Sequence, residues 1–193
     1  MRVAVTGTHG VGKSTLIADF VEARGSFEAV AEPYWLLAQD GLPFADGPTT
    51  ADLEEQLNFS CVLLLDRAVA ADLIFDRCPL DFLAYLDVVS QREGFEWLPS
   101  GKLLGRIGKA LANLDLIAFV PITRPDEIAA EIEHSALRAQ VDRRLKAMLR
   151  DDDLGLIPDE LRVVAISGDR EARVARLMAA IDSPSRWARR SEG

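Results

Sequence analysis

The stretch GTHGVGKS at residues 7–14 decides how the rest of this sequence is interpreted. It follows the short apolar run Val3–Val5 and leads into a segment in which Leu16, Ile17 and Phe20 recur at helical spacing. The stretch matches the pattern G-x-x-x-x-G-K-[ST], whose glycines let several backbone N–H groups point at one anion. The N-terminus of the following helix adds a partial positive charge. A strand, a loop and a helix in this order therefore predict a phosphate-binding loop.

The loop predicts a nucleoside triphosphate and Mg²⁺ as its ligands. In loops of this pattern the lysine, here Lys13, reaches the β- and γ-phosphates, and the hydroxyl of Ser14 ligates Mg²⁺. His9 lies inside the loop, and two interpretations stay open: an imidazole near the phosphates, or a spacer. The residues expected to bind the nucleotide are Gly7, Gly10, Val11, Gly12, Lys13, Ser14 and Thr15.

Outside the loop, apolar runs of strand length alternate with segments of helical periodicity. Strands are expected at residues 3–5, 27–31, 73–75, 116–120 and 163–166. Helices are expected from Lys13, from Thr50, over 82–89, over 103–111, within 125–150 and over 174–181. Near-continuous apolar strands that alternate with helices indicate an α/β fold with a parallel sheet covered on both faces. We expect a single domain over residues 1–181 and a C-terminal tail at residues 182–193.

The composition restricts the partners. The chain has 193 residues, a net charge of −9 and only two cysteines. An acidic chain lacks the basic surface that general binding to nucleic acid or to an anionic membrane needs. No apolar run approaches the roughly 20 residues of a membrane span, and the strand-like start leaves no secretory segment. We therefore expect a cytoplasmic protein that binds its anionic ligand at a local site, with no cysteine framework or metal cluster.

Asp76 and Arg77, directly after the third strand, narrow the class of phosphate-loop protein. No Asn-Lys-x-Asp signature of guanine binding occurs in the chain, and the acid that a ring-forming ATPase carries next to its strand-end Asp is missing. A carboxylate suits the shell of a metal ion, and a guanidinium suits a phosphate or substrate group. The pair thus favours phosphoryl transfer, and a surface ion pair remains the alternative.

Two segments carry a resemblance to known kinases. DRCPLDFLAY at residues 76–85 resembles the Asp-Arg segment of thymidylate and deoxynucleoside kinases, and EPYW at residues 32–35 is similar to the Glu-Pro-x-x-x-Trp segment of deoxynucleoside kinases. The whole arrangement resembles the AAA_28-type bacterial kinases, the group that includes the ribosylnicotinamide kinase domain. The resemblance implies the three-layer sandwich of P-loop NTPases, with a five-stranded parallel sheet in the order 2-3-1-4-5 and helices on both faces.

The resemblance also implies roles for individual residues. It makes Glu32 the candidate general base, places Asp76 near Mg²⁺ or its waters, and assigns Arg77 to the acceptor or to the transferring phosphate. A carboxylate that caps a helix or forms a salt bridge is the alternative for Glu32. The charged segment at about residues 122–150 is the candidate lid. Its arginines are expected to neutralise charge on the transferring phosphoryl group, or else to form the solvated face of a helix.

Arg138 is the first candidate among the lid arginines, followed by Arg124 and Arg143. On the acceptor side, Gln56 matches a base-reading glutamine of deoxynucleoside kinases. Tyr34, Trp35 and Phe59 are candidates for stacking on an acceptor ring, with the core as their alternative location. The turn at residues 167–169 resembles the adenine-side loop of nucleotide kinases, and a helix start with Asp169 as its N-cap is the alternative.

We therefore predict ATP- and Mg²⁺-dependent phosphoryl transfer to a hydroxyl of a nucleoside- or nucleotide-like small molecule. A nucleoside monophosphate kinase is a variant in which extra arginines face the phosphate of the acceptor. A nucleotide-dependent regulatory ATPase without a small-molecule acceptor is the alternative from another class. The oligomeric state does not follow from the sequence, and a homodimer stays open.

Overall fold

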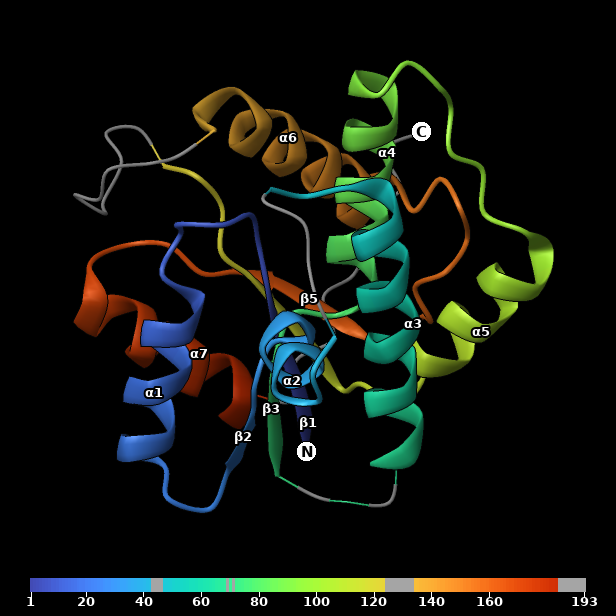
Figure 1. The fold of residues 1–193 in the computed structure, drawn as a ribbon. Coiled ribbons are helices and arrows are strands. Elements are labelled where there is room, and N and C mark those ends of the chain that lie inside the picture. The colour runs from blue at the N-terminus through green and yellow to red at the C-terminus, as the bar shows by residue number, and fades with distance from the viewer. Residues whose placement is uncertain (43–46, 69, 71, 124–133, 184–193) are drawn as a thin grey trace, which may run out of the picture.

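Five parallel strands form the centre of the molecule in the computed structural model, which describes residues 1–42, 47–68, 70, 72–123 and 134–183 (Figure 1). The strands are β1 (Arg2–Thr6), β2 (Glu28–Val30), β3 (Leu73–Asp76), β4 (Leu116–Phe119) and β5 (Arg162–Ala165). They are ordered β2-β3-β1-β4-β5, and every neighbouring pair is parallel. The predicted fold class and strand order are thereby confirmed.

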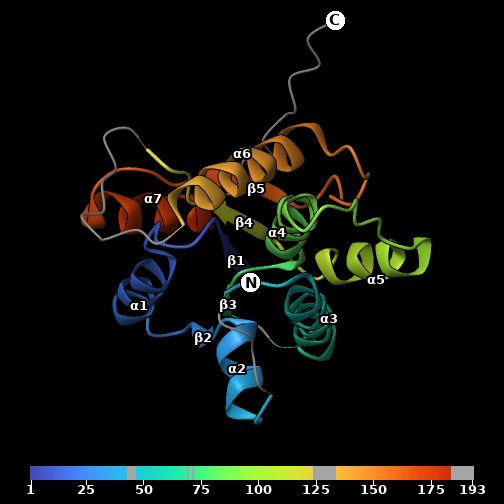
Figure 2. The same cartoon turned by 45° about the horizontal axis from the view of Figure 1, so that its top comes forward.

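Helices cover both faces of this sheet. They are α1 (Lys13–Ala23), α2 (Pro33–Gln39), α3 (Thr50–Asp66), α4 (Pro79–Arg92), α5 (Gly101–Leu111), α6 (Ser135–Asp151) and α7 (Arg170–Asp182). Figure 2 shows α1 and α7 on one side of the sheet and α3, α4 and α5 on the other, and the buried apolar residues of α6 pack with those of α3 and α4. No described helix combines the length and the apolar character that crossing a membrane requires.

The central strand β1 contributes to both halves of the core because side chains alternate across a strand. Val3 and Val5 pack with the residues of α1 and α7, whereas Ala4 packs with those of α3, α4, α5 and α6. All three side chains are fully buried. With β3 on one side and β4 on the other, the carboxyl end of β1 lies in the middle of the sheet edge that carries the phosphate loop.

The structure differs from the sequence-based expectation at two prolines. We expected the second strand to run to residue 31 and to be broken by Pro33, but it ends at Val30, and Pro33 begins α2. Pro79 likewise begins α4 three residues before the expected start at Phe82. Proline is favoured in the first turn of a helix because its φ is already helical and its missing N–H needs no partner. Both prolines therefore start helices next to candidate site residues.

Candidate active site

The phosphate loop follows β1 and depends on its glycines. Gly7 has φ 148°, and a Cβ at this position would lie 2.5 Å from the carbonyl oxygen of Val120. Gly12 has φ 84° and precedes the first residue of α1. Because side chains are strained at positive φ, these two positions require glycine. The loop can thus turn tightly against the end of β4 and enter α1 directly.

Basic side chains hold the outer side of this loop. The carbonyl oxygens of five successive loop residues each accept a hydrogen bond from an arginine or a lysine. The pairs are Arg77 Nη1 to Gly7 at 3.1 Å, Lys13 Nζ to Thr8 at 3.1 Å, Arg138 Nε to His9 at 3.0 Å, Arg138 Nη2 to Gly10 at 3.2 Å and Arg173 Nη1 to Val11 at 2.6 Å. All four basic residues are buried. With its carbonyl oxygens turned outward, the loop is prepared to direct its amides at an anion.

A buried carboxylate anchors the start of the loop. Asp81 on α4 is fully buried, and its Oδ1 accepts from the backbone N–H of Gly7 at 2.9 Å. Its Oδ2 accepts from Thr6 Oγ1 at 2.5 Å and from the N–H of Cys78 at 2.9 Å. The second of these bonds belongs to the capping box of α4. One carboxylate therefore joins the end of β1 to the start of α4 and fixes where the loop begins.

The side chains of Ser14 and Asp76 meet beside the phosphate loop. Ser14 Oγ donates to Asp76 Oδ2 at 2.6 Å, while Asp76 Oδ1 is buried without a hydrogen-bond partner. Burial raises the pKa of Asp76, although Lys13 and Arg77 act in the opposite direction. Among the described residues no group of three or more His, Cys, Asp and Glu side chains could hold a metal ion. A hydroxyl and a carboxylate with an unused oxygen fit Mg²⁺, which keeps several waters and phosphate oxygens as ligands.

Lys13 is buried in this loop. Burial, followed by the charge of Arg77, lowers the pKa of Lys13 from 10.5 to about 8. The carboxylates of Asp76, Glu32 and Asp81 oppose this shift. The unfavourable charge of the ammonium group would be relieved by phosphate oxygens, since an opposite charge favours the ionised form. The loop is thus electrostatically suited to a polyanion.

Glu32 and Arg77 form an ion pair beside the loop. Arg77 Nε donates to Glu32 Oε1 at 2.5 Å, and the guanidinium lies over the ring of Tyr85, 5.3 Å from its centroid. Burial raises the pKa of Glu32, but Arg77 and Lys13 outweigh it, and the net pKa lies below the ordinary value. Arg77 also has φ 79°, a conformation that costs on the order of 1–3 kcal/mol and is found mainly at functional sites. Glu32 is thus an ionised carboxylate held in place.

A cavity of about 580 Å³ opens next to this pair. It is bounded by α2, α3, α4 and the start of α6. Its lining residues are His9, Glu32, Tyr34, Trp35, Gly47, Pro48, Asp52, Leu53, Gln56, Arg77, Phe82, Tyr85, His134 and Leu137. The cavity shares His9 with the phosphate loop, so the loop and the cavity are directly adjacent.

The family comparison agrees with this geometry. A family model described as an AAA domain matches residues 2–173. The chain belongs to the AAA_28 family. This confirms the resemblance inferred from the sequence. A comparison with curated proteins found no significant match.

Solved structures with the same fold as this AAA_28 member include several kinases. Deoxyadenosine kinase from M. mycoides with bound dATP has a TM-score of 0.62 at 14% identity, covering 95% of this chain and 100% of that one. Thymidylate kinase from Candida albicans has a TM-score of 0.59 at 14% identity, covering 94% of this chain and 90% of that one. The NadR protein in complex with NAD and AMP-PNP has a TM-score of 0.61 at 19% identity. The NadR match covers 97% of this chain and 51% of that one, so this chain spans about half the length of NadR.

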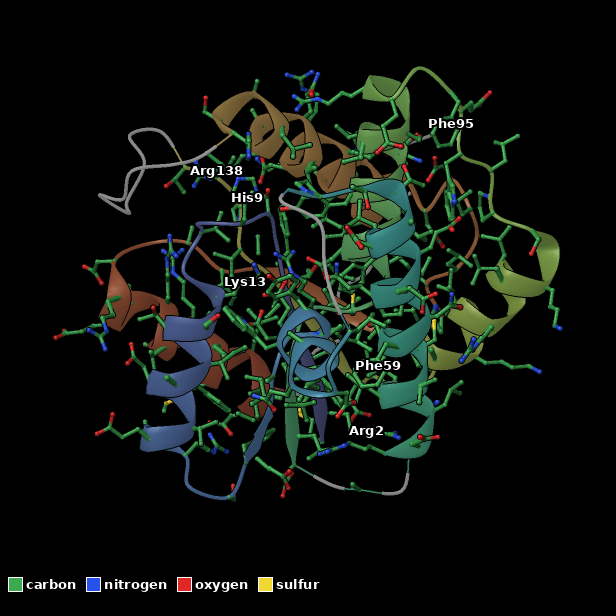
Figure 3. All side chains as sticks on the ribbon, viewed as in Figure 1. Arg2, His9, Lys13, Phe59, Phe95 and Arg138 are labelled. Atoms are coloured by element: carbon green, nitrogen blue, oxygen red, sulfur yellow. The ribbon has the colours of Figure 1, made fainter. Side chains whose placement is uncertain are left out.

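The structure brings most of the sequence-predicted residues of this AAA_28 chain together. Glu32, Arg77, Tyr34, Trp35 and Gln56 line the cavity, and Lys13, Ser14, Asp76 and Arg138 surround the loop. Gln56 Nε2 donates to the carbonyl oxygen of Asp52 at 3.2 Å. Phe59 lies further along α3 and does not line the cavity (Figure 3).

The other predicted residues have different places. Arg143 is exposed and lines a separate groove between α4 and α6. Asp169 Oδ1 accepts from the N–H of Ala172 at 2.8 Å, which makes Asp169 the N-cap of α7. Arg124 lies outside the described residues, together with residues 125–133 of the proposed lid and residues 184–193 of the proposed tail.

The sequence analysis did not assign a role at the loop to Arg173, Tyr85 or Asp81. Arg173 precedes Leu177 by one helical turn and is buried with it. Asp81 lies within the apolar segment at residues 80–86. A charged residue on the apolar stripe of a helix is the signal that could have singled out both, because such a group is seldom buried without partners.

Proposed function

We propose that this AAA_28 protein is a Mg²⁺- and ATP-dependent kinase that phosphorylates a hydroxyl group of a nucleoside-like small molecule. The observation that carries the proposal is the ionised carboxylate of Glu32, which faces a cavity directly adjacent to the phosphate loop. Relatives of the same fold were solved with dATP and with AMP-PNP, which supports ATP as the donor.

Each residue of the site has its own role in the proposed phosphoryl transfer. Ser14 and Asp76 would hold Mg²⁺, which when bound neutralises negative charge on the phosphates. Glu32 takes the proton of the acceptor hydroxyl as its oxygen forms a bond to the γ-phosphorus. The bond from that phosphorus to the β,γ-bridging oxygen breaks, and its electron pair stays on ADP. Lys13 and Arg77 stabilise the charge that develops between donor and acceptor.

The charges in the cavity favour a nucleoside over a nucleoside monophosphate. Arg77 is the only arginine or lysine in the described lining, and its Nε and Nη1 donate to Glu32, Asp81 and the carbonyl of Gly7. Glu32 and Asp52 contribute two carboxylates to the same lining. A phosphate on the acceptor would meet more negative than positive charge there, and this repulsion disfavours it.

The test is ADP formation by the purified protein with ATP, Mg²⁺ and a panel of nucleosides, their monophosphates and shikimate. We expect turnover with a nucleoside, and we expect Glu32→Gln to lower kcat about 10²-fold or more while binding of an ATP analogue is retained. Glu54→Gln is the matched control, since Glu54 accepts from Trp97 Nε1 away from the cavity. Turnover by Glu32→Gln at the wild-type rate would rule out the assigned base. ATP hydrolysis that ignores every acceptor would instead favour a regulatory ATPase.

A further inference from the structure

His9 has a position that the assigned roles do not explain. It belongs to the phosphate loop, and it also lines the cavity beside Glu32 and Arg77, which we call the acceptor cavity. Its backbone is held on both sides: the N–H donates to Tyr85 Oη at 3.0 Å, and the carbonyl accepts from Arg138 Nε at 3.0 Å. Figure 3 shows Arg138 and His9 together above Lys13. The imidazole therefore stands on a fixed backbone at the border between the phosphate loop and the cavity.

The hydroxyl of Tyr85 also contacts the ring of His9 and the side chain of Thr8. Tyr85 Oη lies 2.8 Å from His9 Nδ1 and 3.2 Å from Thr8 Oγ1, which is itself 3.5 Å from His9 Nδ1. Thr8 is fully buried, and Tyr85 is 6% exposed. Each of the two hydroxyl protons needs an acceptor within this small group, since a buried donor without a partner costs on the order of 1–3 kcal/mol.

The number of hydroxyl protons in this group determines whether His9 Nδ1 carries a proton. If Nδ1 carries no proton, Tyr85 donates to it and Thr8 donates to Tyr85, whose oxygen has two acceptor sites for Thr8 and the His9 N–H. If Nδ1 carries a proton, the backbone N–H and the Nδ1–H of His9 both donate to Tyr85 Oη and fill its two acceptor sites. The Thr8 hydroxyl then has neither Tyr85 nor Nδ1 left as an acceptor. Only the first arrangement satisfies every buried donor, and it leaves the ring proton of a neutral His9 on Nε2.

We propose that Tyr85 fixes His9 as the neutral tautomer protonated on Nε2, and that this N–H donates to an oxygen of the phosphoryl group during transfer. The proposal rests on the kinase function proposed above. His9 is then a catalytic residue, and Tyr85 is a positioning residue that acts through it. The Nε2–H group donates a hydrogen bond to the phosphoryl oxygens, over which negative charge spreads during transfer. The proton itself stays on Nε2. The bonds made and broken, and the transfer of the acceptor proton to Glu32, are unchanged.

The tautomer is tested without any turnover. The chain contains two histidines, so ¹⁵N shifts of the imidazole nitrogens in the labelled full-length protein are assigned with the single variant His134→Gln. At a pH about 1.5 units above the ordinary imidazole pKa, we expect His9 Nδ1 to have the shift of an unprotonated nitrogen and Nε2 that of a protonated one. Tyr85→Phe should shift both signals toward the average of two tautomers. A protonated Nδ1 in the wild type would overturn the proposal.

The catalytic role is tested by initial rates with the acceptor that the panel identifies. We expect His9→Ala to lower kcat about 10²-fold, the loss typical for one donor to a developing charge, with the KM for ATP changed by less than about threefold. His9→Gln, which keeps an N–H donor on a side chain of similar reach, should recover a large part of the loss. Wild-type kcat in His9→Ala would overturn the role.

Tyr85→Phe has a matched control on the same helix. We expect it to lower kcat about tenfold, as is typical for a partner that orients a functional side chain. Ser90→Ala also removes a buried hydroxyl from α4, one that bonds to the carbonyl of Asp87 and the N–H of Trp97, and should leave kcat unchanged. Equal losses in the two variants would make Tyr85 merely structural. If the wild type turns over no acceptor, the proposed function fails, whereas the ¹⁵N measurement still decides the tautomer.

Discussion

The phosphate loop and the acceptor cavity are neighbours built in different ways. The loop is clamped at five successive carbonyls by buried basic side chains and anchored by the fully buried carboxylate of Asp81. In the wall of the cavity, Tyr34 and Trp35 contact each other edge to face, and Trp35 is 60% exposed. A rigid loop suits a triphosphate, which has the same shape in every reaction, because preorganised dipoles need no rearrangement when charge develops. Exposed aromatic side chains suit recognition of one particular acceptor. Changes to the loop should therefore affect the stability of the protein and its affinity for ATP. Changes to the cavity wall should affect only the binding of the acceptor.

The largest effect is expected at Asp81. Asp81→Ala leaves the donors of Thr6, Gly7 and Cys78 without their acceptor and removes one partner of the buried Arg77. We expect a loss of about 3–5 kcal/mol in the free energy of unfolding, measured with urea, because breaking a buried charged network leaves unpaired groups. Asp87→Ala is the control: Asp87 pairs with Arg144 near the surface, and its loss should cost under about 1 kcal/mol. Equal losses would mean that the loop has no special anchor.

Gly7→Ala should have the second-largest effect on stability. The added methyl would overlap the carbonyl of Val120 at a φ that alanine avoids, so we expect about 2–3 kcal/mol of destabilisation. We also expect an at least tenfold weaker affinity for an ATP analogue by calorimetry, since roughly 1.4 kcal/mol of loop distortion suffices for this change. Gly105→Ala is the matched control, because nothing lies within 4 Å of a Cβ on that helical glycine. That variant should gain up to about 1 kcal/mol. Unchanged affinity in Gly7→Ala would contradict the rigid loop.

Arg173→Ala tests a contact across the nucleotide site. Arg173 donates to the carbonyls of Gly168 and Val11, and so joins the turn before α7 to the phosphate loop. We expect affinity for an ATP analogue to fall about tenfold, because the buried carbonyl of Val11 and the half-buried carbonyl of Gly168 lose a charged donor. Arg170→Ala on the same helix removes an exposed pair with Asp19 and should leave the affinity unchanged. Two equal affinities would show that the loop does not depend on α7.

The lowered pKa of Lys13 predicts that both the affinity for an ATP analogue and the contribution of Lys13 to stability depend on pH. Its pKa of about 8 in the free protein lies below the ordinary lysine value of 10.5, whereas phosphate favours the charged form. Affinity for an ATP analogue should therefore fall by up to tenfold per pH unit above about 8. In the free protein the sign is opposite: between these two values the unfolded chain binds more protons, so the contribution of Lys13 to stability rises with pH. Lys13→Met should flatten both profiles, while Lys102→Met, at an exposed position of α5, should leave both profiles unchanged. A wild-type affinity that stays constant from about pH 7 to about pH 10 would contradict this assignment.

Trp35→Ala should have the smallest effect on the protein itself. Because Trp35 is largely exposed, we expect a stability change within about 0.5 kcal/mol. The KM for the acceptor should rise about five- to tenfold, since an aromatic ring that stacks on a base contributes on the order of 1–3 kcal/mol. The affinity for an ATP analogue should not change. Leu98→Ala, another exposed apolar residue, should leave the KM as it is. A weaker ATP affinity in Trp35→Ala would mean that loop and cavity are not separate units.

Local sequence patterns were sufficient to predict the five strands, most of the helices and the phosphate loop. Apolar runs predicted all five strands, and the glycine and lysine spacing predicted the loop. The strand order came from family resemblance, since no local pattern encodes which strands pair. The helix α2 was missed because Pro33 ends a strand and begins a helix equally well.

The contacts that hold the site together depend on residues far apart in the sequence. Arg138 and His9 are 129 positions apart, Arg173 and Val11 are 162 apart, and Tyr85 and His9 are 76 apart. Each side chain looks like an ordinary member of its helix until packing against the sheet brings it to the loop. Local periodicity reports which face of a helix is buried, and it says nothing about which distant backbone group that face meets. Burial then makes the contact specific, because a charge or a hydroxyl removed from water must find its partner there.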